Sequence, residues 1–249
     1  MTFPAPATAN SSLPTIAFIG GGNMASAIIG GLIHQGHPAS QIEVVEPWAE
    51  AREALRKNYG IEAQAEAGPA LQRAQIVVWA VKPQTFRDAA AQAKAHTQGA
   101  LHLSVAAGIR SDSIAQWLGT ERIVRTMPNT PALVGKGMSA LYARPAVSAP
   151  ERQSIEAIMA TTGEFLWVDS EPQLDAVTAL SGSGPAYVFY FLEAMTRAGT
   201  GMGLTEQQAH QLAVGTFVGA SELARRSDDP PSVLRQRVTS KGGTTYAAL

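Results

Sequence analysis

The segment 15–31, TIAFIGGGNMASAIIGG, constrains this chain more than any other part of its sequence. A short apolar, β-branched run at 15–19 stops at three consecutive glycines, and helix-compatible residues with apolar side chains at helical spacing resume at Asn23. This pattern predicts a strand, a tight turn and a helix. It has the form G-x-G-x-x-A, which is typical of dinucleotide-binding turns, because the first N–H groups of the helix can face a pyrophosphate there.

Each small residue of this turn has an expected role. Gly20 is expected to make the turn, Gly22 to leave room for a pyrophosphate against bare backbone, and Ala25 to let the helix pack closely on the strand. Turns with three glycines also form for purely structural reasons. The motif alone therefore leaves nucleotide binding open.

Composition restricts the classes of function. The chain has 249 residues, a formal net charge of -1, 5 scattered histidines and no cysteine. The near-neutral charge gives no electrostatic basis for binding nucleic acid or an anionic membrane surface. The lack of cysteine excludes a thiolate zinc site, a disulfide scaffold and a cysteine nucleophile, and it fits a cytoplasmic protein. We expect no bound metal.

The first residues, 1–14, are rich in Pro, Ala, Ser and Thr and lack the pattern of a signal peptide. We expect them to form a disordered tail. The sequence contains no apolar run of about 18 residues, so we expect no membrane span.

Strand and helix patterns alternate over residues 15–168. The strand patterns lie at 15–19, 41–45, 75–81, 101–105, 123–127, 137–142 and 165–168. The main helical patterns lie at 23–29, 48–59, 85–96, 109–118 and 149–161. This alternation predicts a doubly wound parallel α/β sheet, the Rossmann-like architecture of dinucleotide-binding domains.

Polar and small residues follow several strand ends, where ligands bind in such sheets. Glu46 closes the second strand, and an acid there favours a free ribose 2′-hydroxyl and so NADH, although Arg52 is close enough in sequence to pair with a 2′-phosphate. Lys82 closes the third strand, and the turn 106–108 is small enough to admit a flat ring. For each of these, a purely structural role is the alternative. Two prolines fix the loop 128–131 at the same edge.

The chain changes character at Asp169. No further strand pattern occurs, and helical patterns follow at 173–180, 185–199 and 205–225, the last with a threonine cap at Thr205. The segment 185–191 is apolar on nearly all sides, so we expect another subunit to bury part of it. We therefore expect residues 169–249 to form a helical domain that dimerises.

Six motifs connect the chain to a known family. They are GGGNMASAIIGG, AVKPQ, SVAAGI, RTMPNTPALVGKG, LSGSGPAYVF and TSKGGTTYAAL, in this order along most of the chain. Together they closely resemble the pyrroline-5-carboxylate reductases, oxidoreductases that catalyse the last step of proline biosynthesis. The resemblance implies reduction of the C=N bond of 1-pyrroline-5-carboxylate by NADPH or NADH to give L-proline. It also implies a Rossmann domain, a helical dimerisation domain, and homodimers that can assemble into decamers.

The resemblance further implies which residues bind the cofactor. The pyrophosphate would lie against Gly20, Gly21, Gly22, Asn23, Met24 and Ala25. The ribose would lie beside Glu46 and Pro47, and the cleft would be lined by Ala80, Val81, Lys82 and Pro83. The nicotinamide end would lie near Ala106, Ala107 and Gly108, with Asn129 orienting the ring or the loop that carries it.

The implied substrate pocket comes from the helical domain and consists of Ser240, Gly243, Thr244 and Thr245. Glu171 aligns with an acid near the substrate ring nitrogen. Thr245 is the implied catalytic residue, as a hydrogen-bonding partner of that nitrogen. Because threonine is a poor general acid at neutral pH, we expect solvent or an already protonated iminium to supply the proton.

The chain departs from the family pattern at three positions. Lys241 stands where proline is usual, and Ala67 replaces an asparagine that contacts the adenosine. Glu46 is unusual for a preference for NADPH, so the choice between NADPH and NADH stays open. The family also continues for about one more helix beyond the position of Leu249.

Two other functional classes remain as alternatives. A relative of the β-hydroxyacid dehydrogenases would share the overall plan but would carry a catalytic lysine on the interdomain helix, and the segment 185–199 contains none. The chain could also be a non-catalytic NAD(P)-binding protein, although the turn at 240–245 argues for a substrate. Oxidation of NADPH on addition of pyrroline-5-carboxylate separates these classes.

Overall fold

The computed structural model describes residues 13–249, so that the predicted disordered tail lies almost wholly outside the described residues. The chain forms two compact units, one reaching to Pro185 and the other starting at Ala186. No helix within residues 13–249 is both long enough and apolar enough to cross a membrane.

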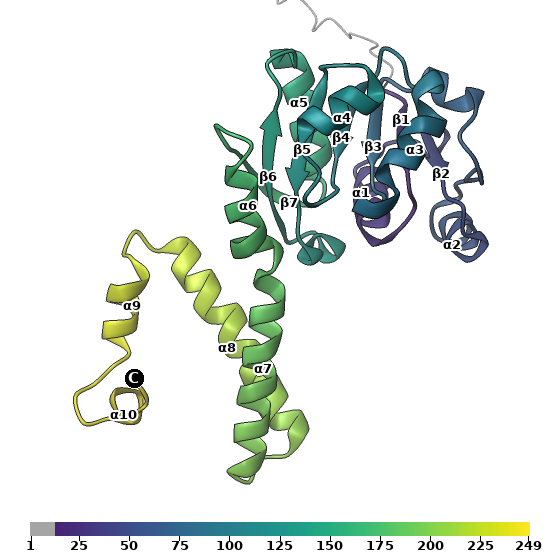
Figure 1. The fold of residues 1–249 in the computed structure, drawn as a ribbon. Helices are drawn as coiled ribbons and strands as arrows, with labels where there is room; N and C mark the ends of the chain where they lie inside the picture. The colour runs from purple at the N-terminus through teal and green to yellow at the C-terminus, as the bar shows by residue number, and fades with distance from the viewer. Residues whose placement is uncertain (1–12) are drawn as a thin grey trace, which may run out of the picture. The chain divides into compact units, whose positions relative to one another are not determined.

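The first unit is built on one seven-stranded sheet with the order β2-β1-β3-β4-β5-β6-β7 (Figure 1). The strands are β1 Ile16–Ile19, β2 Ile42–Val45, β3 Ile76–Trp79, β4 Leu101–Ser104, β5 Ile123–Met127, β6 Gly137–Ala143 and β7 Gly163–Trp167. Each lies where the sequence pattern predicts a strand. The α/β Rossmann-like fold class predicted from the sequence is therefore confirmed.

One strand pairing differs from the predicted parallel sheet. The first five strands in sheet order pair in parallel, but β6 runs antiparallel to β5, with Thr126 opposite Leu141. The connection between these two strands, 128–136, is too short for the crossover that a parallel return requires. After the helix α5 (Ala149–Ala160), β7 pairs in parallel with β6.

An isolated bridge completes the order of a dinucleotide-binding sheet. Gln64 forms a single parallel bridge with Val45 on the outer side of β2. If the bridge at Gln64 is counted as a short third strand, β3, β4 and β5 become the fourth, fifth and sixth strands in sequence. The spatial order is then 3-2-1-4-5-6, and it reverses between β1 and β3. Ligands of such sheets bind at that reversal, beyond the carboxyl ends of the strands.

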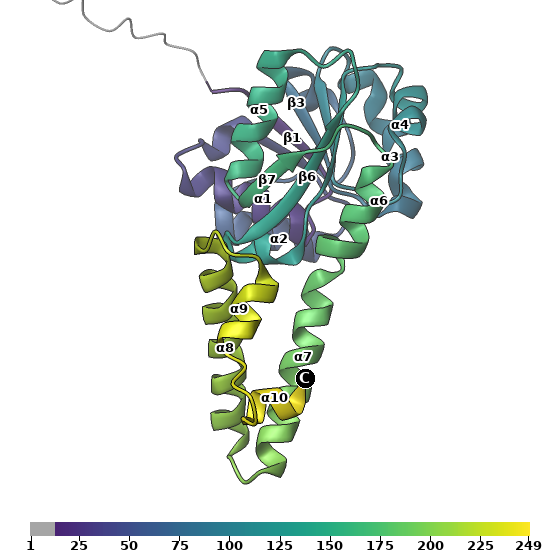
Figure 2. The ribbon, with the colours of Figure 1, turned by 90° about the vertical axis from the view of Figure 1, so that its left-hand side faces the viewer.

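Helices cover both faces of the sheet. Figure 2 shows α1 and α5 on one side and α3 and α4 on the other. The helices of this unit are α1 Asn23–His34, α2 Ala49–Tyr59, α3 Phe86–Ala93, α4 Ser111–Leu118, α5 and α6 Gln173–Val177. Short 3-10 segments are η1 Ala39–Gln41, η2 Pro69–Arg73, η3 Pro83–Thr85, η4 Lys94–His96 and η5 Thr130–Val134.

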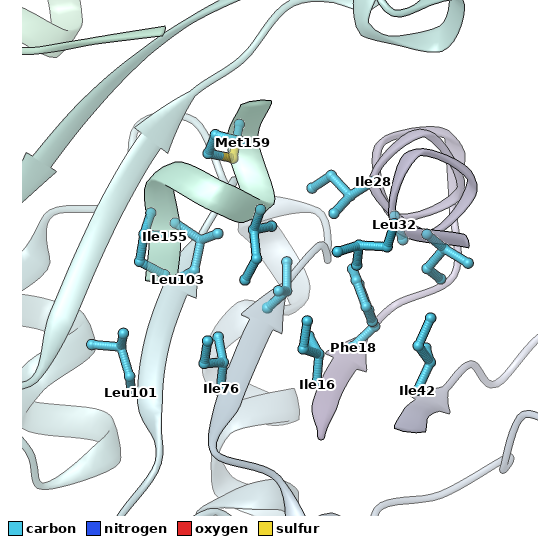
Figure 3. Packing of buried hydrophobic residues seen from close by; sticks show 14 of the residues in the cluster. Ile16, Phe18, Ile28, Leu32, Ile42, Ile76, Leu101, Leu103, Ile155 and Met159 are labelled. Carbon is cyan, nitrogen blue, oxygen red and sulfur yellow. The ribbon is translucent and has the colours of Figure 1, made fainter. Parts of the chain in front are cut away.

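The core lies in two layers, one on each face of the sheet. Alternate residues of the strands point to opposite faces, so that Phe18 joins the layer under α1 and α5 while Ile19 joins the layer under α3 and α4. Figure 3 shows the first layer, in which Ile28 and Leu32 of α1 pack with Phe18. Burial on both faces explains why the strands read as continuous apolar runs.

The second unit is helical. It contains most of α7 (Gly184–Gly201), α8 (Glu206–Arg226), α9 (Pro231–Arg237) and α10 (Thr244–Ala248). As predicted, Thr205 caps α8: its hydroxyl accepts a hydrogen bond from Gln208 N at 3.2 Å, and its N–H donates to Gln208 Oε1 at 3.0 Å. The helix α9 was not predicted, because its two leading prolines are typical of a loop.

The boundary between the units lies later than the predicted boundary at residue 168. Glu171 is 8% exposed and Leu174 of α6 is 1% exposed, and α6 packs against β5 and β6. A π-helical segment, η6 Thr178–Gly182, then leads to α7. Residues 169–185 therefore belong to the compact unit of the sheet, although their composition is that of the helical region.

Candidate functional site

The glycine turn lies at the reversal of strand order. Gly20 has φ +97, and a Cβ at this position would lie 2.5 Å from the carbonyl oxygen of Ala80, at the end of β3. A residue with a side chain could neither adopt this φ readily nor fit there. Gly20 thus holds β1 and β3 close together at the point where such sheets bind their ligands.

Gly22 faces open space. Among the described residues, no atom lies within 4 Å of a Cβ built at this position. Gly22 is the N-cap of α1, no side chain of the described chain caps this helix end, and the first turn of α1 contains no acid. Ala25 is fully buried and lets α1 lie close to the sheet. These features form an open helix N-terminus that suits an anionic group.

Glu46 ties the end of β2 to the glycine turn. Its Oε2 accepts a hydrogen bond from Gly21 N at 2.7 Å, and its Oε1 accepts one from Trp48 N at 2.9 Å. Glu46 is buried, with only 6% of its surface exposed. A Cβ at Gly21 would lie 2.8 Å from Leu55 Cδ1. A larger residue at this position would therefore have to displace the Leu55 side chain.

Arg52 supports the same corner from α2. Its Nη1 donates to the carbonyl oxygens of Glu46 at 2.9 Å and of Pro47 at 2.6 Å. From its position in the sequence, Arg52 was a possible partner for a 2′-phosphate. In the structure at least one of its guanidinium nitrogens serves the backbone instead.

The loops after β3 and β4 lie beside this turn along the carboxyl edge. Ala80 N donates to Ile19 O at 2.8 Å and Val105 N donates to Trp79 O at 3.1 Å, which continues the sheet into both loops. Lys82 is exposed and precedes η3, which begins at Pro83. Gly108, with φ +74, completes the turn 106–108. The structure therefore brings the predicted cofactor residues of four strand ends to one edge.

Asn129 fixes the loop after β5. Its Nδ2 donates to Ser181 O at 3.1 Å, and its Oδ1 accepts from Met138 N at 2.9 Å. Both ends of the side-chain amide therefore bind the protein. Of the two roles that the sequence analysis considered, these contacts favour the orientation of the loop.

Glu171 lies in a buried cluster of polar groups. Its Oε1 accepts from Ser111 N at 2.5 Å and from Arg125 Nη1 at 2.7 Å, and its Oε2 accepts from Ser111 Oγ at 2.8 Å. Burial raises the pKa of Glu171, but the hydrogen bonds from Ser111 and the ion pair with Arg125 outweigh burial and hold that pKa below its ordinary value. Glu171 is therefore a carboxylate whose two oxygens are both bound by protein groups.

Ser111 and Arg125 were not predicted from the sequence as site residues. Arg125 stands in the middle of the apolar strand IVRTM and is only 6% exposed. A buried arginine requires an acidic partner, so this arginine was a signal that could have been followed. Ser111 gives no such signal, because serine is common at helix starts.

In the second unit, residues 240–245 form a turn before α10. Gly242 has φ +75, and Gly243 N donates to Ser240 O at 3.0 Å. The helix α10 begins at Thr244, so that Thr244 and Thr245 lie in its first turn. Beside this turn is a cavity of about 710 Å³, lined by Arg235, Gln236, Thr239, Lys241, Tyr246 and Leu249.

Among the described residues, no group of three or more His, Cys, Asp and Glu side chains could hold a metal ion.

Two family models match the chain. A model described as NADP oxidoreductase coenzyme F420-dependent matches residues 15–108. A model described as pyrroline-5-carboxylate reductase dimerisation matches residues 171–249, which starts near the boundary predicted from composition.

Similar proteins cover nearly all of the chain. A pyrroline-5-carboxylate reductase of Pseudomonas aeruginosa is 46% identical over 96% of this chain and 88% of the relative. The structure of a pyrroline-5-carboxylate reductase from Coxiella burnetii matches with a TM-score of 0.86 and 37% identity, covering 94% of this chain and 88% of that one. A Plasmodium falciparum pyrroline carboxylate reductase with NADP bound matches with a TM-score of 0.85 and 27% identity, covering 95% and 88%.

The open helix end at the strand-order reversal, together with the region matched at 15–108, defines an NAD(P)-dependent oxidoreductase. The similarity to pyrroline-5-carboxylate reductases continues through the helical region, residues 171–249, and the identity of 46% over nearly the whole chain shows common descent. The chain belongs to the pyrroline-5-carboxylate reductase family.

Proposed function

We propose that this chain reduces 1-pyrroline-5-carboxylate to L-proline with NADPH or NADH. The observation that carries the proposal is 46% identity to a pyrroline-5-carboxylate reductase over 96% of the chain. The geometry of the first unit fits the cofactor, because Gly22 and the uncapped start of α1 leave space and N–H groups for a pyrophosphate. The cofactor, when bound, supplies a hydride from C4 of its nicotinamide.

The residues of the sheet edge have proposed roles in holding the cofactor. The start of α1, with Asn23 and Met24, would bind the pyrophosphate, and Glu46 with Pro47 would flank the adenosine ribose. The loops 80–83 and 106–108 would line the nicotinamide half, with Asn129 holding the neighbouring loop in place. Supporting this assignment, all these segments lie at the carboxyl edge of one sheet.

The turn 240–245 is the proposed substrate site. The substrate has one carboxylate and an imine that accepts hydride readily only when its nitrogen is protonated. Clustered N–H groups and the hydroxyls of Ser240 and Thr244 suit the carboxylate, and Thr245 would hold the ring nitrogen by a hydrogen bond. The hydride adds to the imine carbon, the proton stays on nitrogen, and L-proline and the oxidised cofactor leave. Holding the reacting carbons together supplies most of the rate.

Both alternatives are weaker. The β-hydroxyacid dehydrogenase reading requires a lysine on the interdomain helix, and α7 contains none. A binding protein without turnover gives no reason for the similarity to continue through the substrate turn.

The proposed assembly is a homodimer, with a decamer as the larger form. In the single chain, α7 and α8 expose large apolar residues that a second copy would cover: Val188, Phe189, Tyr190, Phe191, Met195, Leu212, Val218 and Leu223. This exposure within one chain supports the expectation that another subunit buries part of the segment 185–191. The proposed location is the cytoplasm, since a chain without cysteine needs no oxidising compartment.

The direct test is an absorbance assay with the purified chain, pyrroline-5-carboxylate and each reduced cofactor. We expect the near-ultraviolet absorbance of the reduced nicotinamide to fall only when substrate is present. If neither NADPH nor NADH is oxidised, the chain is not a reductase of this substrate. Light scattering on the same sample measures the assembly.

A further inference from the structure

The segment 171–182 is attached to the sheet at both of its ends. At its start, Glu171 binds Ser111, the first residue of α4, and Arg125 in the middle of β5. At its end, the carbonyl of Ser181 accepts the hydrogen bond from Asn129. The first attachment reaches α4, which follows the loop proposed to line the nicotinamide half of the cofactor, and the second reaches the neighbouring loop 128–131.

The Glu171 attachment joins two neighbouring strands. Ser111 directly follows the loop 106–110, which leaves β4, while Arg125 lies two residues before the end of β5, which leads into the loop 128–131. Because β4 and β5 pair in parallel, these two loops leave the same edge of the sheet side by side. One carboxylate thus fixes both of them.

The cluster of Glu171, Ser111 and Arg125 is buried, and its polar groups have few other hydrogen-bond partners nearby. Ser111 is 1% exposed and Arg125 is 6% exposed, and Arg125 Nε meets no hydrogen-bond acceptor in the described part of the chain. Ser111 Oγ also accepts a hydrogen bond from Arg144 Nη1 at 3.1 Å, which extends the cluster to the residue that follows β6. With this little freedom, a change at Glu171 must move a loop or leave a buried charge without its partner.

We propose that Glu171 acts with Ser111 and Arg125 as a positioning cluster, which fixes the loops 106–110 and 128–131 relative to one another for hydride transfer. This inference rests on the proposed reductase function. It replaces the implied contact of Glu171 with the substrate ring nitrogen, because both carboxylate oxygens are already bound within the first unit. Glu171 is therefore a positioning residue and not a catalytic one.

The test compares Glu171→Gln with a matched control, Glu151→Gln. Glu151 also pairs with an arginine, Arg122, but the pair lies between the start of β5 and the start of α5, away from the carboxyl edge. We expect Glu171→Gln to lower kcat by about 10-fold or more, with the KM for pyrroline-5-carboxylate changed less than about 2-fold. The pH profile of kcat/KM keeps its shape. Glu151→Gln is expected to retain the wild-type kcat.

A second variant and a second measurement cover the case in which Glu171→Gln folds poorly. Ser111→Ala removes the hydrogen bond to Oε2 and the acceptor of Arg144 Nη1, but it keeps the backbone N–H that binds Oε1. We expect a smaller fall in kcat, again with KM unchanged. Amide hydrogen exchange on the protein without cofactor should become faster at residues 106–111 in Glu171→Gln and stay unchanged there in Glu151→Gln.

Three results overturn the inference while the wild type remains an active reductase. A raised substrate KM with a displaced pH profile assigns Glu171 to substrate contact. An unchanged kcat with lowered thermal stability makes the cluster purely structural, and unchanged exchange at 106–111 shows that it does not hold the loop. An inactive wild type, in contrast, contradicts the proposed function itself.

Discussion

The carboxylate of Glu46, at the end of β2, accepts a hydrogen bond of 2.7 Å from the backbone N–H of Gly21 in the middle of the glycine turn. One side chain therefore both shapes the turn and places a negative charge where the adenosine ribose of a dinucleotide lies in such folds. A 2′-phosphate would meet that charge at close range. We therefore expect the same contact to connect the stability of the turn to the choice of cofactor.

We predict that Glu46→Gln shifts the ratio of kcat/KM values towards NADPH by about 10-fold or more, because it removes the charge. The amide oxygen can still accept from Gly21 N, while the acceptor for Trp48 N is lost. Glu46→Ser should shift the ratio in the same direction while loosening the turn. The measurement is kcat/KM with NADPH and NADH for each variant. Glu50→Gln, an exposed acid in the first turn of α2, is the control. An unaltered ratio in Glu46→Gln shows that this acid does not select the cofactor.

Gly20 and Gly22 should respond differently to the same substitution. Gly20→Ala puts a Cβ at a positive φ and 2.5 Å from Ala80 O, so we expect a loss of stability of about 2 kcal/mol or more. Gly22 has φ -72 and open space, so Gly22→Ala should change stability by less than about 1 kcal/mol but weaken cofactor binding by about 10-fold or more, because the methyl group occupies the proposed pyrophosphate position. Denaturant unfolding and fluorescence titration with NADPH measure the two effects. Wild-type affinity in Gly22→Ala contradicts that position.

Local sequence patterns predicted the strands and most helices of this fold, because burial and turn chemistry leave marks on neighbouring residues. They did not predict the direction of β6, since an apolar run reads the same in both directions. The hydrogen-bond partners of Glu171 were also out of reach. Ser111 and Arg125 lie 60 and 46 residues away in sequence, and only the packed sheet brings them together.

Some residues of the candidate site could likewise be predicted from local sequence patterns, and others could not. The glycine turn could be predicted because each of its residues meets a local steric demand, and the structure shows those demands at Gly20 and Ala25. The substrate turn came from resemblance, because Ser240 to Thr245 alone also fits an ordinary turn between helices. The use of Asn129 to brace its loop depends on Ser181 and Met138, which no local pattern indicates.

We predict that Thr245→Ala lowers kcat by about 10-fold or more and leaves the affinity for NADPH intact, since one hydrogen bond in the transition state is worth about 1 to 3 kcal/mol. Steady-state kinetics and a separate cofactor titration provide the two readouts. Thr120→Ala is the matched control, because Thr120 Oγ1 accepts only the local hydrogen bond from Arg122 N that the structure shows. Unchanged kinetics in Thr245→Ala remove Thr245 from the site.

His102 makes stability depend on pH. It is buried on β4, where its Nδ1 accepts a hydrogen bond from Trp79 Nε1 at 3.0 Å, and burial, with the nearby positive charge of Arg122, lowers its pKa from 6.5 to about 4. The folded state therefore holds His102 neutral while the unfolded chain binds a proton below about pH 6.5. The stability due to this difference is fully present above about pH 6.5 and is lost as the pH falls towards about 4.

We predict that the free energy of unfolding falls by about 3 kcal/mol from this source between about pH 6.5 and pH 4, since one pKa unit corresponds to about 1.4 kcal/mol. Urea unfolding at intervals across this range measures the slope. His102→Leu lowers stability near neutral pH, because Trp79 Nε1 loses its acceptor, but it should flatten the slope in this window. If the slope of His102→Leu equals that of the wild type, other groups cause the pH dependence and His102 is not its source.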